Sequence, residues 1–368
     1  MKASLLHARA YTPPPLPPSP VTTTQARSMS QTQRTAYARD VRRFLNGHYF
    51  DSDRDRRIRA FLHHLIEDNA EALTGTRDVA ILTGPNVMGK STLLYQVAYA
   101  VHRQHVGEGA DTAVMARRTV TRTIGTREHQ VHPTHTPVLL LSLEAATTVT
   151  KFNELVVEVL DYEKSVAKKV TALDLLLQHG VRLLIIDDLH QLILTEKLGR
   201  YALDHLKAVV TAVGEYGVTV IFAGANLSHH KVMDDPQVTG RAYELTVAPY
   251  AADTGQDAVA WQRFLKECGS LIAPHLPMAS PGMLHNQLPG LILEGTHGRM
   301  QAVVNLVRRA TVAAIEDGTW CVTEDHVRAV PAAKLTRDEY TGAARPAPAP
   351  EPLHPTVSVS HRERGGVG

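Results

Sequence analysis

The chain has 368 residues, with 39 Lys and Arg against 37 Asp and Glu, a formal net charge of +2. This balance excludes an argument for nucleic-acid binding from overall charge, so any such argument has to be local. The two cysteines, Cys268 and Cys321, exclude a disulfide framework and a cysteine-rich zinc site. No apolar run reaches the roughly eighteen residues of a membrane span, and no apolar core follows Met1. We therefore expect a cytoplasmic protein that has no signal peptide and does not contact the membrane.

The beginning of the chain is rich in Pro, Ser, Thr and Gln, including the run Pro13-Pro14-Pro15. Such a composition buries too little apolar area to offset the entropy of ordering, so we predict a disordered arm over residues 1–35. This segment is either an arm that contacts nucleic acid or a solvated tail. The basic residues within it and just beyond it are Arg27, Arg34, Arg39, Arg42 and Arg43.

The most informative motif is a glycine-bounded loop that follows a buried strand. Apolar residues on one face predict a helix over residues 53–72. The apolar and β-branched residues 79–83 then predict a strand, and apolar spacing predicts a helix over 93–102. The loop between them consists of Gly84, Pro85, Asn86, Val87, Met88, Gly89, Lys90, Ser91 and Thr92.

This strand–loop–helix arrangement predicts a phosphate-binding loop. Glycines allow backbone N–H groups to turn towards phosphates, and the helix N-terminus favours anions. Lys90 is expected to reach the β- and γ-phosphates, and the hydroxyl of Ser91 is expected to bind Mg²⁺. We therefore expect a nucleotide-binding protein with ATP and Mg²⁺ as its cofactors.

Residues 106–136 break the regular pattern with glycines, threonines and arginines. An irregular segment or short hairpin of this length in a compact domain is usually functional or disordered. Its arginines indicate either a contact with the DNA backbone or a solvated surface loop. His129, His132 and His135 lack acidic or cysteine partners, which favours a surface loop over a metal site. The arginines are Arg117, Arg118, Arg122 and Arg127.

An apolar strand that ends in a carboxylate is the expected partner of the phosphate loop. Asp187 ends such a strand and is expected beside Ser91, where it can hold the water shell of Mg²⁺. Asp188 either polarises the attacking water or caps the following loop. As a catalytic group it would be slow, because its side chain is one methylene shorter than glutamate. The predicted elements here are a strand, two helices and a second strand, over residues 138–143, 150–162, 166–179 and 181–188.

Two further polar residues follow or precede predicted strands. A helix over residues 198–216 and a strand over 218–223 lead to Asn226. Ligands of open parallel sheets collect beyond the carboxyl ends of strands, so Asn226 either senses the γ-phosphate or attacking water, or only forms a turn. Arg241 precedes a strand over 243–247 and either reaches the nucleotide of a neighbouring subunit or is an ordinary surface residue.

The chain becomes helical after the last predicted strand. We expect residues 50–250 to form an ATPase core with an insertion at 106–136, and residues 253–332 to form a helical lid domain. Arg299 begins one lid helix, where it can place a cation on the phosphates. Residues 342–368 are predicted to be a disordered tail. The lid helices are predicted over residues 258–272, 286–293, 300–315 and 324–330.

The order of these elements resembles the AAA+ class of ATPases. Within that class the sequence is similar to the TniB/TnsC-type transposition ATPases, and more distantly to the Mu B target-capture protein. The resemblance implies an α/β fold of the P-loop NTPase type, with a parallel sheet flanked by helices and followed by a small helical lid domain. It spans about residues 50–332. The segments that carry it are 83–92, 137–143, 183–192, 224–227, 235–241 and 295–318.

The resemblance also implies roles for individual residues. Lys90 and Ser91 would bind phosphate and Mg²⁺, Asp187 would be the Walker B acid, and Asp188 stands where glutamate is usual. The residues that would act as sensor one, as the arginine supplied in trans and as sensor two are Asn226, Arg241 and Arg299.

By the same resemblance, we expect a homo-oligomeric ATPase that forms a ring or filament on DNA. It would couple the state of ATP to recruitment of a transposase or target-selection protein. The alternative is a signalling or defence NTPase in which nucleotide switches protein–protein assembly without DNA. A replication-initiator ATPase is a third class, but the DNA-reading domain expected of it is not predicted after Val330.

Overall fold

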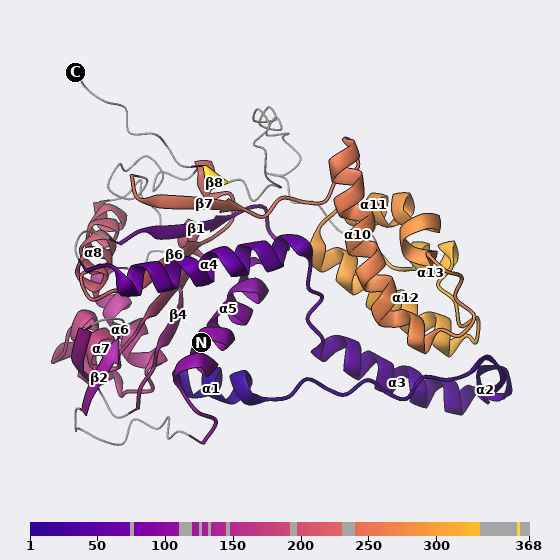
Figure 1. Cartoon of the computed structure of the whole chain (residues 1–368), viewed down its shortest axis with the longest axis horizontal. Coiled ribbons are helices and arrows are strands. Elements are labelled where there is room, and N and C mark those ends of the chain that lie inside the picture. Colours follow the sequence, from indigo (N-terminus) through magenta and orange to yellow (C-terminus); the bar gives the residue numbers. More distant parts are fainter. Residues whose placement is uncertain are drawn as a thin grey trace.

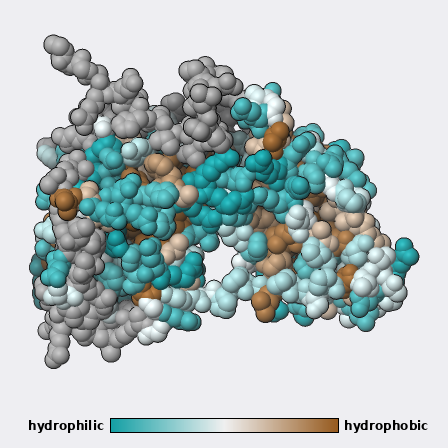
Figure 2. Space-filling view, viewed as in Figure 1, coloured by the Kyte–Doolittle hydropathy of each residue, from teal (hydrophilic) through white to brown (hydrophobic). Residues whose placement is uncertain are grey.

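The chain forms a central sheet with helices on both faces and a neighbouring bundle of helices (Figure 1). Most of the surface that carries a hydropathy colour in Figure 2 is hydrophilic. Within the described parts of the chain, no helix is both long enough and apolar enough to span a membrane. The computed structural model describes residues 1–73, 77–109, 120–124, 127–131, 134–144, 148–191, 197–229, 240–331 and 359–360.

Five strands of the sheet are parallel, in the order β4, β5, β6, β1 and β7. All residues of β1, β5 and β6 are buried, so apolar runs rather than alternating patterns mark them. The five predicted strands are confirmed. Because they are parallel, the residues that follow β1, β5 and β6 meet at one edge. The bounds are Val79–Thr83 (β1), Val138–Ser142 (β4), Leu183–Asp187 (β5), Thr219–Ala223 (β6) and Ala242–Thr246 (β7).

Successive residues of each strand pack against opposite layers of helices. Val79 and Ile81 lie in the cluster beneath one layer, whereas Ala80 and Leu82 lie in the cluster beneath the other. The first layer is formed by α6 (Val149–Val159), α7 (Ala172–Gln178) and α8 (Lys197–Gly214). The second is formed by α4 (Asp53–Glu71) and α5 (Lys90–His105).

The single helix predicted over residues 166–179 is wrong, because the chain forms two helices there. A 3-10 helix, η1 (Lys164–Lys168), precedes α7. Between them, the Thr171 side chain accepts a hydrogen bond from the backbone N–H of Asp174, and the Asp174 carboxylate accepts one from the Thr171 N–H. This capping box begins a new helix at a point that apolar spacing alone does not reveal.

Part of the predicted insertion at 106–136 is a hairpin, which was one of the two structures expected for it, the other being an irregular segment. The strands β2 (Val120–Ile124) and β3 (Arg127–Val131) pair antiparallel. Arg117 and Arg118 lie outside the described residues, as do the side chains of Arg122 and Arg127. The predicted tail at 342–368 also lies outside them, except for β8 (Val359–Ser360), which pairs antiparallel with β7.

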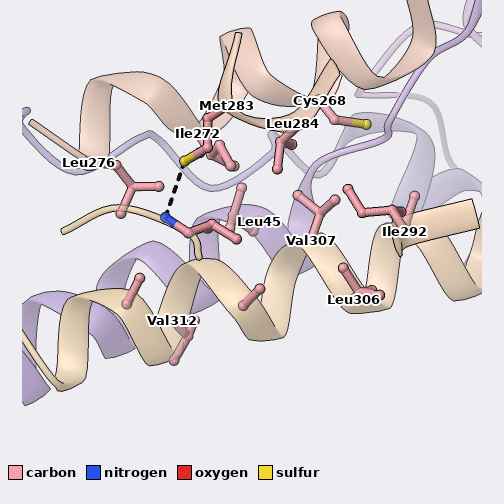
Figure 3. Packing of buried hydrophobic residues seen from close by; sticks show 14 of the residues in the cluster. Leu45, Cys268, Ile272, Leu276, Met283, Leu284, Ile292, Leu306, Val307 and Val312 are labelled. Carbon is pink, nitrogen blue, oxygen red and sulfur yellow. Dashed lines mark hydrogen bonds between the residues drawn. The ribbon is translucent and has the colours of Figure 1, made fainter. Parts of the chain in front are cut away.

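The helical lid contains the four predicted helices. The helix predicted from residue 286 begins at Pro289, whose fixed φ suits the first turn of a helix. Figure 3 shows how apolar side chains from these helices interlock, with Val322 N–H donating to the Met283 sulfur over 3.1 Å. Trp320 is buried in this core. The helices are α10 (Gly255–Ile272), α11 (Pro289–Thr296), α12 (Met300–Glu316) and α13 (Glu324–Ala329).

The prediction of a disordered arm over residues 1–35 is wrong, because this segment is helical. The structure contains α1 (Ala3–Tyr11), α2 (Thr23–Ser28) and α3 (Gln31–Gly47). The Ser, Thr and Gln that suggested disorder form capping boxes, Thr22 with Gln25 and Ser30 with Gln33. The helices α2 and α3 contribute to the apolar core of the lid, where Leu45 is fully buried (Figure 3).

The first helix belongs to the sheet rather than to the lid. Leu6 of α1 is buried in the same cluster as α4 and α5, and His7 Nδ1 lies 2.9 Å from His102 Nε2 on α5. The Ser4 N–H donates to Asp161 over 3.1 Å. Residues 12–22 then run from α1 on the core to α2 on the lid (Figure 1), and Figure 2 shows an opening between the two parts beside this connection. One segment therefore spans both parts of the molecule.

Burial of His102 predicts a loss of stability in acid. Burial, with His7, His135 and Arg103 nearby, lowers the pKa of His102 from 6.5 to about 4. The unfolded chain therefore takes up this proton first as the pH falls, and the stability present above pH 6.5 is lost between pH 6.5 and 4. In His102→Gln, the free energy of unfolding should fall less steeply between pH 6 and 5, by up to about 1.4 kcal/mol per pH unit.

Denaturant unfolding at several pH values measures this slope. His64→Gln is the matched control, since His64 has a side chain that is 77% exposed. A slope in His102→Gln equal to that of the unchanged protein would contradict the assignment.

Candidate functional site

The predicted phosphate loop joins β1 to α5 through three residues with positive φ. Gly84 has φ +140°, Val87 +65° and Gly89 +84°. A Cβ atom at Gly84 would overlap the carbonyl oxygen of Val247, so only glycine fits there. Val87 is β-branched, and its left-handed backbone is strained, a feature that collects at ligand-binding loops. Gly89 caps α5 without a side chain, which leaves this helix N-terminus suited to an anion.

Lys90 places its cation inside the loop. Its side chain is buried, and Nζ donates to the carbonyl oxygens of Gly84 at 2.8 Å and Pro85 at 2.6 Å. In both hydrogen bonds the ammonium group donates to a neutral backbone carbonyl oxygen. A phosphate oxygen on the loop would offer the same group a charged and stronger acceptor.

The expected proximity of Ser91 and Asp187 is confirmed. The Ser91 hydroxyl donates to Asp187 Oδ2 over 2.7 Å. Asp187 is the last residue of β5 and only 7% exposed, and its Oδ1 accepts the backbone N–H of Asp188 at 2.9 Å. A hydroxyl and a carboxylate beside an anion site form the oxygen donor set that Mg²⁺ prefers, so these residues fit the implied metal.

Asp188 points towards the neighbouring strand. Its backbone has φ +58°, and its Oδ2 accepts a hydrogen bond of 2.6 Å from the hydroxyl of Ser142, the last residue of β4. Its carbonyl oxygen accepts the N–H of Gln191 at 2.8 Å, so its backbone shapes the turn that follows. Its catalytic role and its role as a cap of the following loop both stay predictions. Sequence reasoning missed Ser142, because a serine at a strand end becomes informative only once β4 and β5 are known to pair in register.

Asn226 lies next to the loop through its backbone. Its N–H donates to Gly84 O over 3.1 Å, its φ is +48°, and its side chain is exposed. These observations agree with the turn-forming alternative, and its sensing role stays a prediction. His190 holds the same turn, because its Nδ1 accepts the N–H of Ala225 at 3.2 Å.

Arg241 lies at the amino ends of the parallel strands, whereas the phosphate loop lies at their carboxyl ends. Its carbonyl oxygen accepts the N–H of Val79, the first residue of β1, at 3.0 Å. Its guanidinium is half-buried and donates to Thr211 on α8 over 3.3 Å, and burial lowers its pKa. The structure therefore does not bring Arg241 to the site of its own chain. Its action on a neighbouring subunit's nucleotide stays a prediction.

Arg299 is 4% exposed and directly precedes the lid helix α12, which contacts the phosphate loop. The N–H of Gln301 on α12 donates to Val87 O over 3.2 Å. Gly298 has φ +66°, and a Cβ atom there would overlap the carbonyl oxygen of Tyr250, whose N–H donates to Gly298 O at 2.9 Å. The fold thus brings the Arg299 segment beside the loop, as the sequence suggested, and its role on the phosphates stays a prediction.

A cavity of about 330 Å³ adjoins the loop, within the size range of small-molecule sites. Gly89 and Thr92 line it from the loop, and lid residues line the facing side. The sequence did not predict the lid side of this cavity, because the residues that line it come from distant segments that share no motif. The lid and connecting residues include His48, Tyr49, Phe50, Met300, Gln301 and Arg308.

Of the three histidines of the insertion, His135 is the one whose side chain the structure describes. His135 Nδ1 lies 3.0 Å from the carbonyl oxygen of His179, and His132 is outside the described residues. Among the residues that the structure describes, no three His, Cys, Asp or Glu side chains lie close enough together to hold a metal ion.

The phosphate loop, the acid at the tip of β5 and the helical lid on the loop define a P-loop ATPase of the AAA+ type, a nucleotide-binding class. The strand order places β6 between β1 and β5, as this class requires. The family model described as bacterial TniB protein matches residues 48–251, more than half of the chain. The chain belongs to the TniB family.

Solved structures with a similar course share little sequence. The ORC2 protein of Aeropyrum pernix, in ADPNP-ADP complexes, has a TM-score of 0.49 and 15% identity over 79% of this chain and 70% of that chain. ORC1 of Aeropyrum pernix, in complex with DNA, has a TM-score of 0.45 and 13% identity over 75% and 63%. Drosophila ORC bound to DNA has a TM-score of 0.44 and 14% identity over 89% of this chain and 72% of that chain. No curated protein sequence matches the chain.

Gly298 should tolerate no side chain, because its φ and the Tyr250 carbonyl both exclude one. Gly298→Ala is expected to lower the free energy of unfolding by at least about 2 kcal/mol. Gly269→Ala is the matched control, since Gly269 lies within α10 and no atom is near its Cβ position. That change should raise stability by roughly 0.5–1 kcal/mol. Chemical denaturation measures both free energies, and equal effects would contradict the close contact between Gly298 and the Tyr250 carbonyl.

Proposed function

We propose that this protein is an ATP-dependent DNA-transposition helper, which binds ATP with Mg²⁺, hydrolyses it slowly, assembles on DNA and recruits or regulates a transposase. The observation that carries the nucleotide part is the 2.7 Å hydrogen bond between Ser91 and Asp187 beside the phosphate loop. Membership of the TniB family supports the transposition part.

Triphosphate binding falls to the backbone of residues 84–89 and the N-terminus of α5. Lys90 would exchange the carbonyl oxygens of Gly84 and Pro85 for phosphate oxygens, which gain more from its charge. Ser91 and Asp187 would hold Mg²⁺, which when bound neutralises charge on the β- and γ-phosphates. The nucleoside would occupy the cavity between the loop and the lid, where Tyr49 and Gln301 offer polar contacts.

Hydrolysis needs a group that orients the attacking water, and we assign this to Asp188. Ser142 holds its carboxylate at the edge of the sheet. An aspartate reaches less far than a glutamate, so turnover is slow. Asn226 and Arg299 would respond to the γ-phosphate, and Arg241 of one subunit would complete the site of the next in a ring or filament.

DNA contact is assigned to the insertion that contains the β2–β3 hairpin. Its arginines, Arg117, Arg118, Arg122 and Arg127, can neutralise backbone phosphates without reading sequence. A transposase or target-selection protein would then recognise the nucleotide-bound assembly.

Asp188→Asn tests the catalytic assignment. The amide keeps a similar shape but cannot accept a proton, so nucleotide affinity should be unchanged while turnover falls about 100-fold. Phosphate release and the binding of a fluorescent ATP analogue measure the two quantities. Asp204→Asn, on the exposed face of α8, is the control and should leave both unchanged. Unaltered turnover in Asp188→Asn would show that another group orients the water.

DNA binding tests the proposed function as a whole. With a non-hydrolysable ATP analogue, the protein should bind duplex DNA with an affinity that falls steeply as salt rises. Lys90→Ala should lose nucleotide binding and, with it, the nucleotide-dependent part of DNA binding. Gel filtration with and without DNA separates the alternatives. Assembly that needs nucleotide but ignores DNA would favour a signalling or defence NTPase and sink the transposition assignment.

A further inference from the structure

Arg54, at the beginning of α4, contacts three different segments through one guanidinium group. Its Nη1 donates to the carbonyl oxygen of Ala248 over 2.8 Å, and its Nη2 lies 3.2 Å from the sulfur of Met300. Its Nε donates to Asp55 over 3.3 Å. Figure 1 shows the amino end of α4 at the junction between the sheet and the lid. Arg54 therefore joins helix α4 of the core, the connection to the lid and the lid itself.

Arg54 contacts the connection that leads from β7 of the core to the lid, residues 247–250, which we call the hinge. The hinge begins after β7 at Val247, whose N–H donates to Thr83 O over 2.8 Å. It ends at Tyr250, whose ring stacks on Phe264 of α10 with centroids 4.9 Å apart. The Arg54 guanidinium lies 5.1 Å from the centre of the Tyr250 ring, within the range of a cation–π contact. Any rotation of the lid about this hinge has to move atoms that Arg54 binds.

The lid atom that Arg54 contacts also faces the phosphate loop. Met300 is the first residue of α12, and its sulfur is the nearest atom to the Cβ position of Gly89. The next residue, Gln301, donates to the loop carbonyl of Val87. A displacement of the Arg54 side chain would therefore act on Met300 and, through the first turn of α12, on the phosphate loop.

A polar chain connects Arg54 to the wall of the cavity. Asp55 is buried and accepts hydrogen bonds from Arg54 and from the hydroxyl of Tyr49, the latter over 2.7 Å. Tyr49 and Asp55 both line the cavity, and the Arg54–Asp55 pair is shielded, with side chains 20% and 4% exposed. A charge pair shielded from water transmits a change in one partner to the other more strongly than an exposed pair does.

We propose that Arg54 is a positioning residue that couples occupation of the cavity to the angle of the lid. A nucleoside that contacts Tyr49 or Asp55 alters the ion pair between Asp55 and Arg54. The guanidinium group then changes its contacts with Ala248 and Met300. The residue type follows from the geometry, because a planar guanidinium reaches three acceptors and an aromatic face at once, which a lysine ammonium does not. The coupling rests on the proposed function in one respect, namely that nucleotide occupies this cavity.

The test is a comparison of Arg54→Met, Arg54→Lys and the unchanged full-length chain, each with and without the non-hydrolysable ATP analogue. Spin labels at Glu215→Cys on the core and Ser270→Cys on the lid, with Cys321→Ser, report the distance between the two parts. Both label positions are exposed. Arg57→Met, on the same helix, is the matched control, and circular dichroism with thermal unfolding shows that each variant is folded. Arg54→Lys retains a positive charge beside Asp55, so it serves as the test variant if Arg54→Met does not fold.

In the unchanged chain and in Arg57→Met, nucleotide should shift the distance distribution between core and lid. In both Arg54 variants the shift should be lost, while nucleotide still binds with an affinity about tenfold weaker. A folded Arg54 variant whose lid moves as in the unchanged chain would overturn the coupling alone. If the unchanged chain bound no nucleotide by fluorescence titration, the proposed function would fail and the coupling with it.

Discussion

The contact between Ser91 and Asp187 is the interaction on which the site depends. These residues are 96 positions apart, yet their oxygens lie 2.7 Å from each other. The contact exists because β1 and β5 run parallel and end at the same edge, where α5 begins directly after the loop. A carboxylate as buried as Asp187 needs hydrogen-bond donors, and the Ser91 hydroxyl and the Asp188 N–H supply them. The same two donors orient the carboxylate towards the anion-binding end of the helix.

A second constraint is the attachment of the lid to the loop from two sides. On one side α12 reaches Val87 through Gln301, and on the other the hinge packs its Val247 carbonyl against Gly84. The amino-terminal segment adds a third connection, since α1 packs on the core and α2 and α3 complete the lid. The phosphate loop is thus contacted both by the lid helix α12 and by the segment that connects the lid to the core.

Much of the fold follows from local patterns. The strands at 79–83 and 183–187 are buried on both faces, so each is a run of apolar residues that no helix period explains. The phosphate loop is equally local, because Gly84, Gly89 and Lys90 act within a few residues of one another. By contrast, the amino-terminal helices were missed because composition does not distinguish a solvated serine from one that caps a helix. Ser30 acts as a cap, and the apolar partners of Val41 and Leu45 lie far along the chain.

The sequence by itself determined the class of protein and the residues of the phosphate loop, since both rest on short-range backbone geometry and on strands that are mostly apolar. Only the tertiary structure decided which distant side chains meet. It brought Ser142 to Asp188, set Arg54 between hinge and lid, and placed Arg241 at the far edge of the sheet. These contacts depend on strand order and on the packing of the lid, which no periodicity along the chain encodes.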